Sequence, residues 1–410
     1  MDSLPLIRPP SRRSVVILTI LLLTVGFGEG LARGLQLRLG LSSPWVLVFL
    51  VIGACFGYYV LILRQPVALR RVVHTEALLW FLVLGLVIQI AVDGHINMAG
   101  YIQLCLFAAF LTLVRGVFAA ADSRITRSLG QAILVAHLFM CGYVVATWVI
   151  WYAMRMDVSV TRLIDPTLGF PYNVYSGFRP AAWSTEPAWA AMSISVSYIG
   201  VHYLLPNRRP VALIAMTVAA VMLQSATLFL FDGVILGVTI LKHLHRPEFI
   251  AIGAAVAAML VFGPVFPRAD AIVAGNDAST RMRVASVGVA VDVISKSFPL
   301  GVGYGNFRDV AVYGDEWSQQ IGSDPSSYYK SDVVVLNMVA ELGLGGLVLL
   351  AYSFWVLRFG SLLLPSLFLV MLSSASGTIL LPAVLVLGAI VGCLDRASIE
   401  AQAIRDASPP

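Results

Sequence analysis

Residues 129–153 read LGQAILVAHLFMCGYVVATWVIWYA, a run that contains no Asp, Glu, Lys or Arg. A helix that crosses the hydrocarbon core of a bilayer needs about 20 mainly apolar residues, so this run is long enough to span a membrane. Similar runs recur along the whole chain, which is 59% hydrophobic and 12% charged. Soluble domains carry roughly 25% charged residues. The sequence therefore predicts an all-α polytopic membrane protein.

We expect about twelve transmembrane helices in a single integral membrane domain, residues 1–410. The two shortest, 211–223 and 226–241, meet at Gln224–Ser225, where we expect a tight hairpin; one broken helix is the alternative. The expected spans are 14–32, 44–63, 77–92, 101–119, 129–153, 187–205, 211–223, 226–241, 249–266, 333–357, 359–374 and 378–394.

The basic residues predict that both termini are cytoplasmic, because cytoplasmic loops are enriched in Lys and Arg. With the hairpin included, the short basic loops all lie on the cytoplasmic side of a bacterial inner membrane. These loops and the C-terminal tail contain Arg64, Arg70, Arg71, Arg124, Arg127, Arg208, Arg209, Lys242, Arg246, Arg358, Arg396 and Arg405. Since they are dispersed between apolar runs, the net charge of +5 does not indicate nucleic-acid binding.

Two long extracytoplasmic loops are predicted, residues 154–186 and 267–332. The second loop holds six basic residues against eight acidic ones, a balance that fits the outer side. Within it, residues 284–298 are expected to form an amphipathic helix that lies on the membrane surface. The apolar residues at helical spacing are Val284, Val287, Val291, Ile294 and Phe298.

The first loop contains a candidate site around Arg179. This cation is expected close to the bilayer surface in an aromatic-rich segment with Tyr172 and Tyr175, a combination that suits binding of a phosphate and stacking on a sugar ring. The alternative is structural: Glu186 followed by Pro187 is typical of a helix N-terminus, and Trp183 would then be an interfacial aromatic residue.

The second loop contains three further groups of candidates. Arg281 and Arg283, two residues apart on a helix, face different directions, so one could bind an anion while the other contacts the membrane surface. The segment 299–307, PLGVGYGNF, which includes Tyr304, lacks the spacing of a nucleotide loop and is expected to be a turn. Lys330 and Asp332 come just before the helix expected at 333–357.

Several polar residues are expected inside the membrane. Asn337 and Glu341 lie one turn apart on one helix face, where a buried acid usually faces the bundle interior. Structural polar contacts are expected for Glu29, Arg115, His137 and Asp232, which are scattered along the sequence; an ion or proton path is the alternative. Packing inside helices is expected for Cys55, Cys105, Cys141 and Cys393.

Taken together, these segments resemble the superfamily of O-antigen ligases and Wzy-type polysaccharide polymerases. Arg179 and Glu186-Pro187 match an arginine and a Glu-Pro pair before a mid-chain helix. Arg283 matches an arginine upstream of the P-L-x-G-x-G-x-x-F turn at 299–307, and residues 341–347, ELGLGGL, match an E-x-G-x-x-G-L signature. The ligases typically carry a histidine nine residues before that glutamate, whereas this chain has Asp332 there, which favours a polymerase.

The resemblance implies an enzyme that joins oligosaccharide units carried on undecaprenyl diphosphate at the periplasmic face, with no cofactor and no metal. Arg179, Arg281 and Arg283 would stabilise the departing diphosphate, and Glu186 or Asp332 would accept the proton of the acceptor hydroxyl. Substrate contacts are expected from Arg308, Lys330, Tyr172, Trp183 and Tyr304. Expected partners are membrane lipids and, in the same pathway, a chain-length regulator and a flippase.

Two alternative functions remain. A ligase would transfer the finished glycan to an acceptor, and a flippase would move the lipid-linked unit across the membrane. A flippase is expected to line a central cavity with charged residues throughout its helices, whereas the arginines of interest here lie in two loops.

Overall fold

In the structure, a computed structural model, the regular secondary structure of the described residues is entirely helical, and no strand occurs there. The described residues are 12–39, 87, 98–164, 178, 180–184, 187–225, 228–229, 231–235, 237, 278–303, 306–307, 334–357, 364 and 385–397. The predicted all-α class is confirmed for them. The expected spans 44–63, 77–92, 249–266 and 359–374 lie wholly or almost wholly outside these residues, so the count of about twelve stays a prediction.

A bundle of three helices forms the larger core: α7 (Ser123–Met154), α9 (Pro187–Leu204) and α10 (Arg209–Leu223). Helix α7 begins where the side chain of Asp122 accepts a hydrogen bond from the amide of Ile125 at 2.8 Å, which satisfies one of the free amides of the first turn. Helix α9 is buried on all sides from Ala190 to Val201, because its Ala, Ser and Gly residues let neighbouring helices approach closely.

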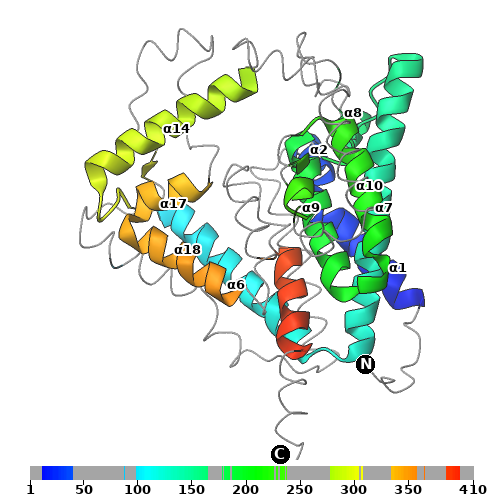
Figure 1. The fold of residues 1–410 in the computed structure, drawn as a ribbon, viewed down its shortest axis with the longest axis horizontal. Coiled ribbons are helices and arrows are strands. Elements are labelled where there is room, and N and C mark those ends of the chain that lie inside the picture. Colours follow the sequence, from blue (N-terminus) through cyan, green and yellow to red (C-terminus); the bar gives the residue numbers. More distant parts are fainter. Residues whose placement is uncertain are drawn as a thin grey trace, which may run out of the picture.

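The three helices of the bundle and the preceding helix, α6, run in alternating directions (Figure 1). Helix α6 (Met98–Ala120) descends in that view, α7 ascends, α9 descends and α10 ascends. The connections 121–122 and 205–208 therefore lie at one end of the bundle, and the segment 178–184 lies at the other. This alternation agrees with the expected spans, while the side of the membrane that each end faces stays a prediction.

Helix α7 is the strongest candidate for a transmembrane helix. Among the described residues it alone combines the length with the apolar composition needed to cross a bilayer. The segments Ala109–Ala120 and Leu344–Trp355 are apolar but shorter. Large apolar side chains also stand exposed on the outer faces of the helices, as expected for surfaces in lipid; examples are Ile17, Ile20, Val135, Val149, Ile214 and Val348.

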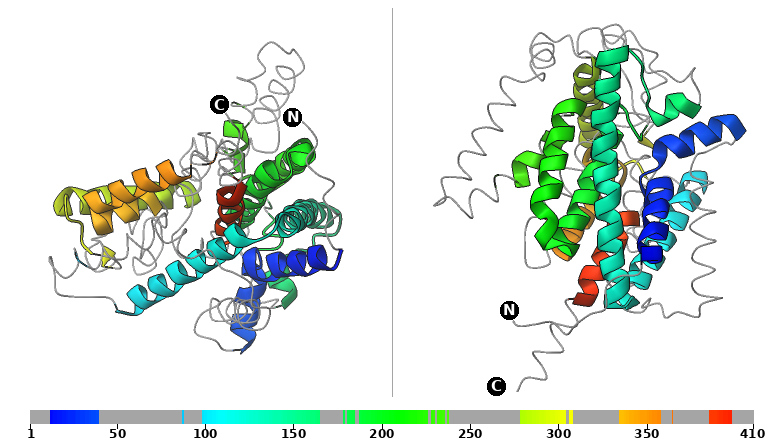
Figure 2. Two further views of the ribbon diagram at one scale, coloured as in Figure 1. Left: turned by 90° about the horizontal axis from the view of Figure 1, so that it is seen from below. Right: turned by 90° about the vertical axis from the view of Figure 1, so that its right-hand side faces the viewer.

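The first expected span, 14–32, is divided rather than continuous. Helix α1 (Arg12–Leu21) ends in the π-helical turn η1 (Leu22–Gly26), and α2 (Glu29–Leu39) then leaves in a different direction (Figure 2). In the π turn, the amide of Phe27 donates to the carbonyl of Leu22 at 2.7 Å instead of to that of Leu23. The carbonyl of Leu23 is thereby left for a partner outside the helix.

Helical residues 385–397 close the bundle against α6. A side chain at Gly388 would collide with Leu111, and one at Gly392 would lie 2.5 Å from the carbonyl oxygen of Arg115. The Nε of Arg115 donates to Asp395 Oδ2 at 2.8 Å, with side chains that are 5% and 23% exposed. The structural role predicted for Arg115 is confirmed.

A second helical group lies apart from the bundle and consists of α14 (Ala278–Ser297), α17 (Val334–Leu342) and α18 (Leu344–Val356). The span expected at 333–357 as one helix is in fact broken between α17 and α18. Gly343 takes φ +55° at the break, a conformation that is readily accessible to glycine. The predicted helix at 284–298 is present as α14 and begins earlier than expected.

Candidate functional site

The glycine-rich turn after α14 is docked on the break between α17 and α18. Three backbone hydrogen bonds hold it there. The amide of Leu344 donates to the carbonyl of Pro299 at 2.8 Å, that of Val302 to Ala340 at 3.0 Å, and that of Gly303 to Glu341 at 2.8 Å. The turn therefore occupies the carbonyls at the end of α17 and an amide at the start of α18, groups that a helix break leaves without intrahelical partners.

Glycines make this contact possible. Gly301 and Gly303 take φ values of +81° and +86°. A Cβ on Gly301 would lie 2.6 Å from the carbonyl of Glu341, and a Cβ on Gly343 would overlap the carbonyl of Pro299. The close packing predicted for the glycines at 343–346 is thus present at Gly343, which packs against the turn that follows α14. Two sequence motifs form one structural unit.

A small apolar core fixes α14 to this unit. It consists of Val289, Ala290, Val293, Phe307 and Ala340. The side-chain amide of Asn306 donates to the carbonyl of Val302 at 3.2 Å and braces the turn. Sequence analysis missed this buried face of α14, although its members recur at helical spacing, because the apolar stripe on the other face is the stronger signal.

That other stripe remains largely outside the protein core. Val284, Val291 and Phe298 are 58%, 52% and 50% exposed. Helix α14 therefore presents an unused apolar face, as the predicted surface helix requires. The end of α14 that carries Arg281 and Arg283 is directed toward the upper end of the bundle in Figure 1.

Asn337 and Glu341 on α17 are both buried, at 7% and 4% exposure. Their predicted position facing the interior is confirmed. The carbonyl of Glu341 also accepts the amide of Gly303, so this residue lies directly beneath the docked turn.

Trp183 anchors the loop that precedes α9. Its Nε1 donates at 2.7 Å to the carbonyl of Leu23, the group that the π turn leaves open. Its ring meets Phe139 and Tyr143 edge-on, with centroids 5.2 and 5.8 Å apart. Both the polar and the apolar parts of the indole are thus engaged within the protein.

The same loop is fixed at two more points. The amide of Val160 donates to the carbonyl of Ala182 at 2.8 Å, and Ala182 has φ +51°. Phe178 stacks on Trp151 near the end of α7, with centroids 4.5 Å apart and planes 17° from parallel. Residues on both sides of Arg179 in the sequence are therefore held against the upper end of α7.

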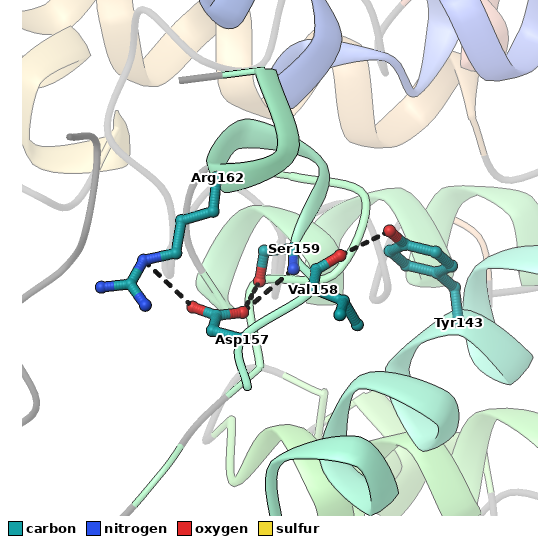
Figure 3. A network of polar contacts seen from close by, with 5 residues as sticks. All are labelled: Tyr143, Asp157, Val158, Ser159 and Arg162. Carbon is teal, nitrogen blue, oxygen red and sulfur yellow. Dashed lines mark hydrogen bonds and ion pairs between the residues drawn. The ribbon is translucent and has the colours of Figure 1, made fainter. Parts of the chain in front are cut away.

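A polar network adjoins this end of α7 (Figure 3). Asp157 accepts hydrogen bonds from the amide of Ser159 at 3.0 Å and from its hydroxyl at 2.6 Å, and its other oxygen lies 3.7 Å from Arg162 Nε. The hydroxyl of Tyr143 donates to the carbonyl of Val158 at 2.6 Å. The network ties the short helix α8 (Val160–Ile164) to α7. The pattern Asp-x-Ser was its only signal in the sequence.

Most candidate residues lie outside the described residues. These are Tyr172, Arg179, Glu186, Tyr304, Arg308, Lys330 and Asp332. Arg281 and Arg283 are described as residues of α14 without their side chains. Trp183 is the candidate whose contacts are known.

Two of the residues expected to make polar contacts inside the membrane, Arg115 and His137, form hydrogen bonds within the protein. His137 lies 2.8 Å from Ser197 Oγ through Nδ1 and 3.0 Å from the carbonyl of Ala212 through Nε2. Because a carbonyl only accepts, Nε2 donates to Ala212, while the hydroxyl of Ser197 donates to the carbonyl of Ile194 at 2.8 Å. The predicted structural contact of His137 is confirmed. Asp232 is buried, as are the free thiols of Cys141 and Cys393.

These features define a helical protein with a docked glycine turn below an arginine-bearing helix. Residues 187–351 match the sequence model of the O-antigen ligase family, Wzy_C. The match begins at the first residue of α9 and ends within α18, so it includes both the turn and the helix break. This part of the chain is therefore similar to the O-antigen ligase family, consistent with the predicted superfamily.

Members of this family are membrane enzymes that act on lipid-linked glycans. The segment from Phe178 to Ser184 precedes the matched residues. No curated protein and no solved structure matches the chain.

Proposed function

We propose that this protein is a polymerase that joins oligosaccharide repeat units carried on undecaprenyl diphosphate, at the outer face of the inner membrane. The observation that carries the proposal is the docking of the 299–303 turn on the break at Gly343. This contact lies within the family-matched residues and fixes α14, whose first two turns bear Arg281 and Arg283.

In the proposed reaction, the acceptor hydroxyl oxygen forms a bond to the anomeric carbon of the growing glycan. The bond between that carbon and the diphosphate breaks, and the diphosphate leaves with the electron pair. Guanidinium groups of Arg179 and Arg283 stabilise the charge that develops on the leaving group, and the proton of the hydroxyl passes to Glu186 or Asp332. Arg281, Arg308, Lys330, Tyr172 and Tyr304 are proposed to contact the substrate.

Trp183 is proposed to serve the reaction by holding the Arg179 segment. Its indole N–H is bonded to Leu23, and its ring packs on Phe139 and Tyr143. This interpretation replaces the sugar-stacking contact suggested by the sequence, since the ring is already engaged within the protein.

Polymerisation is favoured over ligation because the position nine residues before Glu341 is Asp332, and none of the six histidines falls between 267 and 332. It is favoured over lipid flipping because the described intramembrane charge of Arg115 is neutralised by Asp395 inside the helix bundle. A flippase needs such charges to line a path for its substrate.

The proposal is tested by replacing Arg283 and Arg179 separately with Ala and with Lys. Glycan in cells is separated by size, and the amount of protein in the membrane is measured in parallel. Loss of a leaving-group contact is expected to abolish long polymer in both Ala variants, with single repeat units still made; each missing contact costs about 10²–10³ in rate.

Lys restores charge without the forked geometry, so partial recovery is expected from the Lys variants. Arg38, an exposed arginine in the last turn of α2, provides the control, and Arg38→Ala should polymerise normally. Normal polymer length in both Ala variants would refute the assignment. Loss of lipid-linked units from the outer face would indicate a flippase instead.

A further inference from the structure

Arg155 occupies an unusual position directly after α7. Its backbone has φ 57° and ψ 27°, and its amide donates to the carbonyl of Trp151 at 2.7 Å. This left-handed position after a helix is most often filled by Gly, because a Cβ is disfavoured there. The backbone therefore gives no reason for an arginine at this point.

The side chain of Arg155 is held by aromatic rings. Its Cζ lies 6.0 Å from the ring centroid of Trp151 and 5.8 Å from that of Tyr152, both within the range of a cation–π interaction. The residue is exposed, and among the residues that the structure describes no carboxylate pairs with it. Asp157, two positions further on, is engaged by Ser159 and Arg162. The charge of Arg155 is therefore ordered but not neutralised by a described acid.

The ring of Trp151, on which Arg155 lies, also contacts the loop that contains Arg179 in the sequence. Trp151 stacks with Phe178, and Phe178 is the residue before Arg179 in the chain. The ring of Trp151 thus contacts both the side chain of Arg155 and Phe178, the residue that precedes Arg179 in the sequence.

We propose that Arg155 is a second phosphate-binding residue, which contacts the diphosphate of the lipid-linked glycan together with Arg179. This inference rests on the proposed function. A guanidinium held over aromatic rings keeps its N–H donors available in a fixed fork that matches two phosphate oxygens. The phosphate of a phospholipid headgroup offers the same chemistry, so the experiment has to separate the two sources.

The test uses the full-length protein in nanodiscs, with equilibrium binding of undecaprenyl diphosphate as the readout. The variants are Arg155→Gly, Arg155→Lys, Arg283→Ala and the control Arg38→Ala, each in neutral and in anionic lipid. For Arg155→Gly, we expect the Kd to rise about tenfold or more in both lipids, the loss typical of a charged hydrogen bond. Lys should give an intermediate Kd, and Arg38→Ala should bind like the wild type.

The Gly variant separates binding from folding. Since Gly is well suited to the left-handed position, the melting temperature of Arg155→Gly should equal or exceed that of the wild type. Weaker binding by a protein of undiminished stability supports a ligand contact. Wild-type affinity in Arg155→Gly, with binding still lost in Arg283→Ala, would overturn the role of Arg155 and leave the proposed function in place.

Two other outcomes would also overturn the inference. An effect of Arg155→Gly that occurs only in anionic lipid would assign the residue to phospholipid headgroups. A wild-type protein that binds no undecaprenyl diphosphate in either lipid would remove the proposed function together with the role of Arg155.

Discussion

Gly343 is the residue on which the contact between the two late motifs depends most directly. Gly343 has a φ of +55°, and the carbonyl of Pro299 occupies the position that a Cβ would take. Any side chain here would therefore require a shift of the backbone. The glycine is therefore a positional requirement of the docked turn. Gly301, on the other side of the contact, meets the backbone of Glu341 in the same way.

We expect Gly343→Ala to destabilise the protein by about 1–3 kcal/mol from overpacking alone, with an additional cost for the left-handed backbone. The melting temperature in detergent and polymer formation in cells are the measurements. Gly142→Ala is the matched control, because a Cβ there meets no atom within 4 Å, and its stability should stay within about 1 kcal/mol of the wild type. Equal stability of the two variants would contradict this role of Gly343.

At the residue scale, the sequence indicated the glycine-rich motifs but not the contacts that their residues make. The patterns at 299–307 and 341–347 were recognisable as motifs, but their contact joins segments that local patterns cannot relate. The same holds for Trp183, whose partner Leu23 lies 160 positions away. A bond of that kind leaves no periodicity in either segment.

The helices show where hydropathy succeeds and where it fails. Apolar runs predicted the helices at 129–153, 187–205 and 211–223 within a few residues of α7, α9 and α10. The breaks at Phe27 and Gly343 were missed, because hydropathy averages over a window about as long as a span. Each break is stabilised by a distant loop, through Trp183 in one case and Pro299 in the other.

Among the described residues, an ion pair joins α6 to helical residues 385–397. Because Arg115 is 5% and Asp395 23% exposed, removal of either partner leaves a largely buried charge. Arg115→Ala is expected to lower the free energy of unfolding by about 3 kcal/mol, near the lower end for a buried pair. Thermal unfolding of the purified protein is the measurement.

A double-mutant cycle with Asp395→Ala separates the pair from other effects. The double variant should be less destabilised than the sum of the single variants, since no unpaired charge remains. Strictly additive losses would show that the 2.8 Å contact does not couple the two helices.

At the scale of the whole molecule, different segments of the described chain lie at its two ends. The C-terminal end of α7, the segment 178–184 and the first turn of α14 lie toward one end, while the connections 121–122 and 205–208 lie at the other. The positive-inside rule predicts that the former end lies outside the cytoplasm and the latter inside.

This orientation predicts the labelling of single cysteines in a variant without native cysteines. Ser295→Cys, at an exposed position of α14, should react with a membrane-impermeant maleimide in intact spheroplasts. Asn207→Cys, exposed between α9 and α10, should react only after the membrane is permeabilised. Labelling of both positions from the same side would contradict the predicted topology.

The bond from Trp183 to Leu23 also bears on the order of biogenesis. The ribosome releases the first helix long before the tryptophan, and it releases Val386, which packs against Gly26 next to the same π turn, later still. The carbonyl of Leu23 therefore stays without its indole partner until nearly half of the chain has been synthesised. Nascent chains arrested before residue 183 should consequently be the forms that membrane proteases recognise and remove.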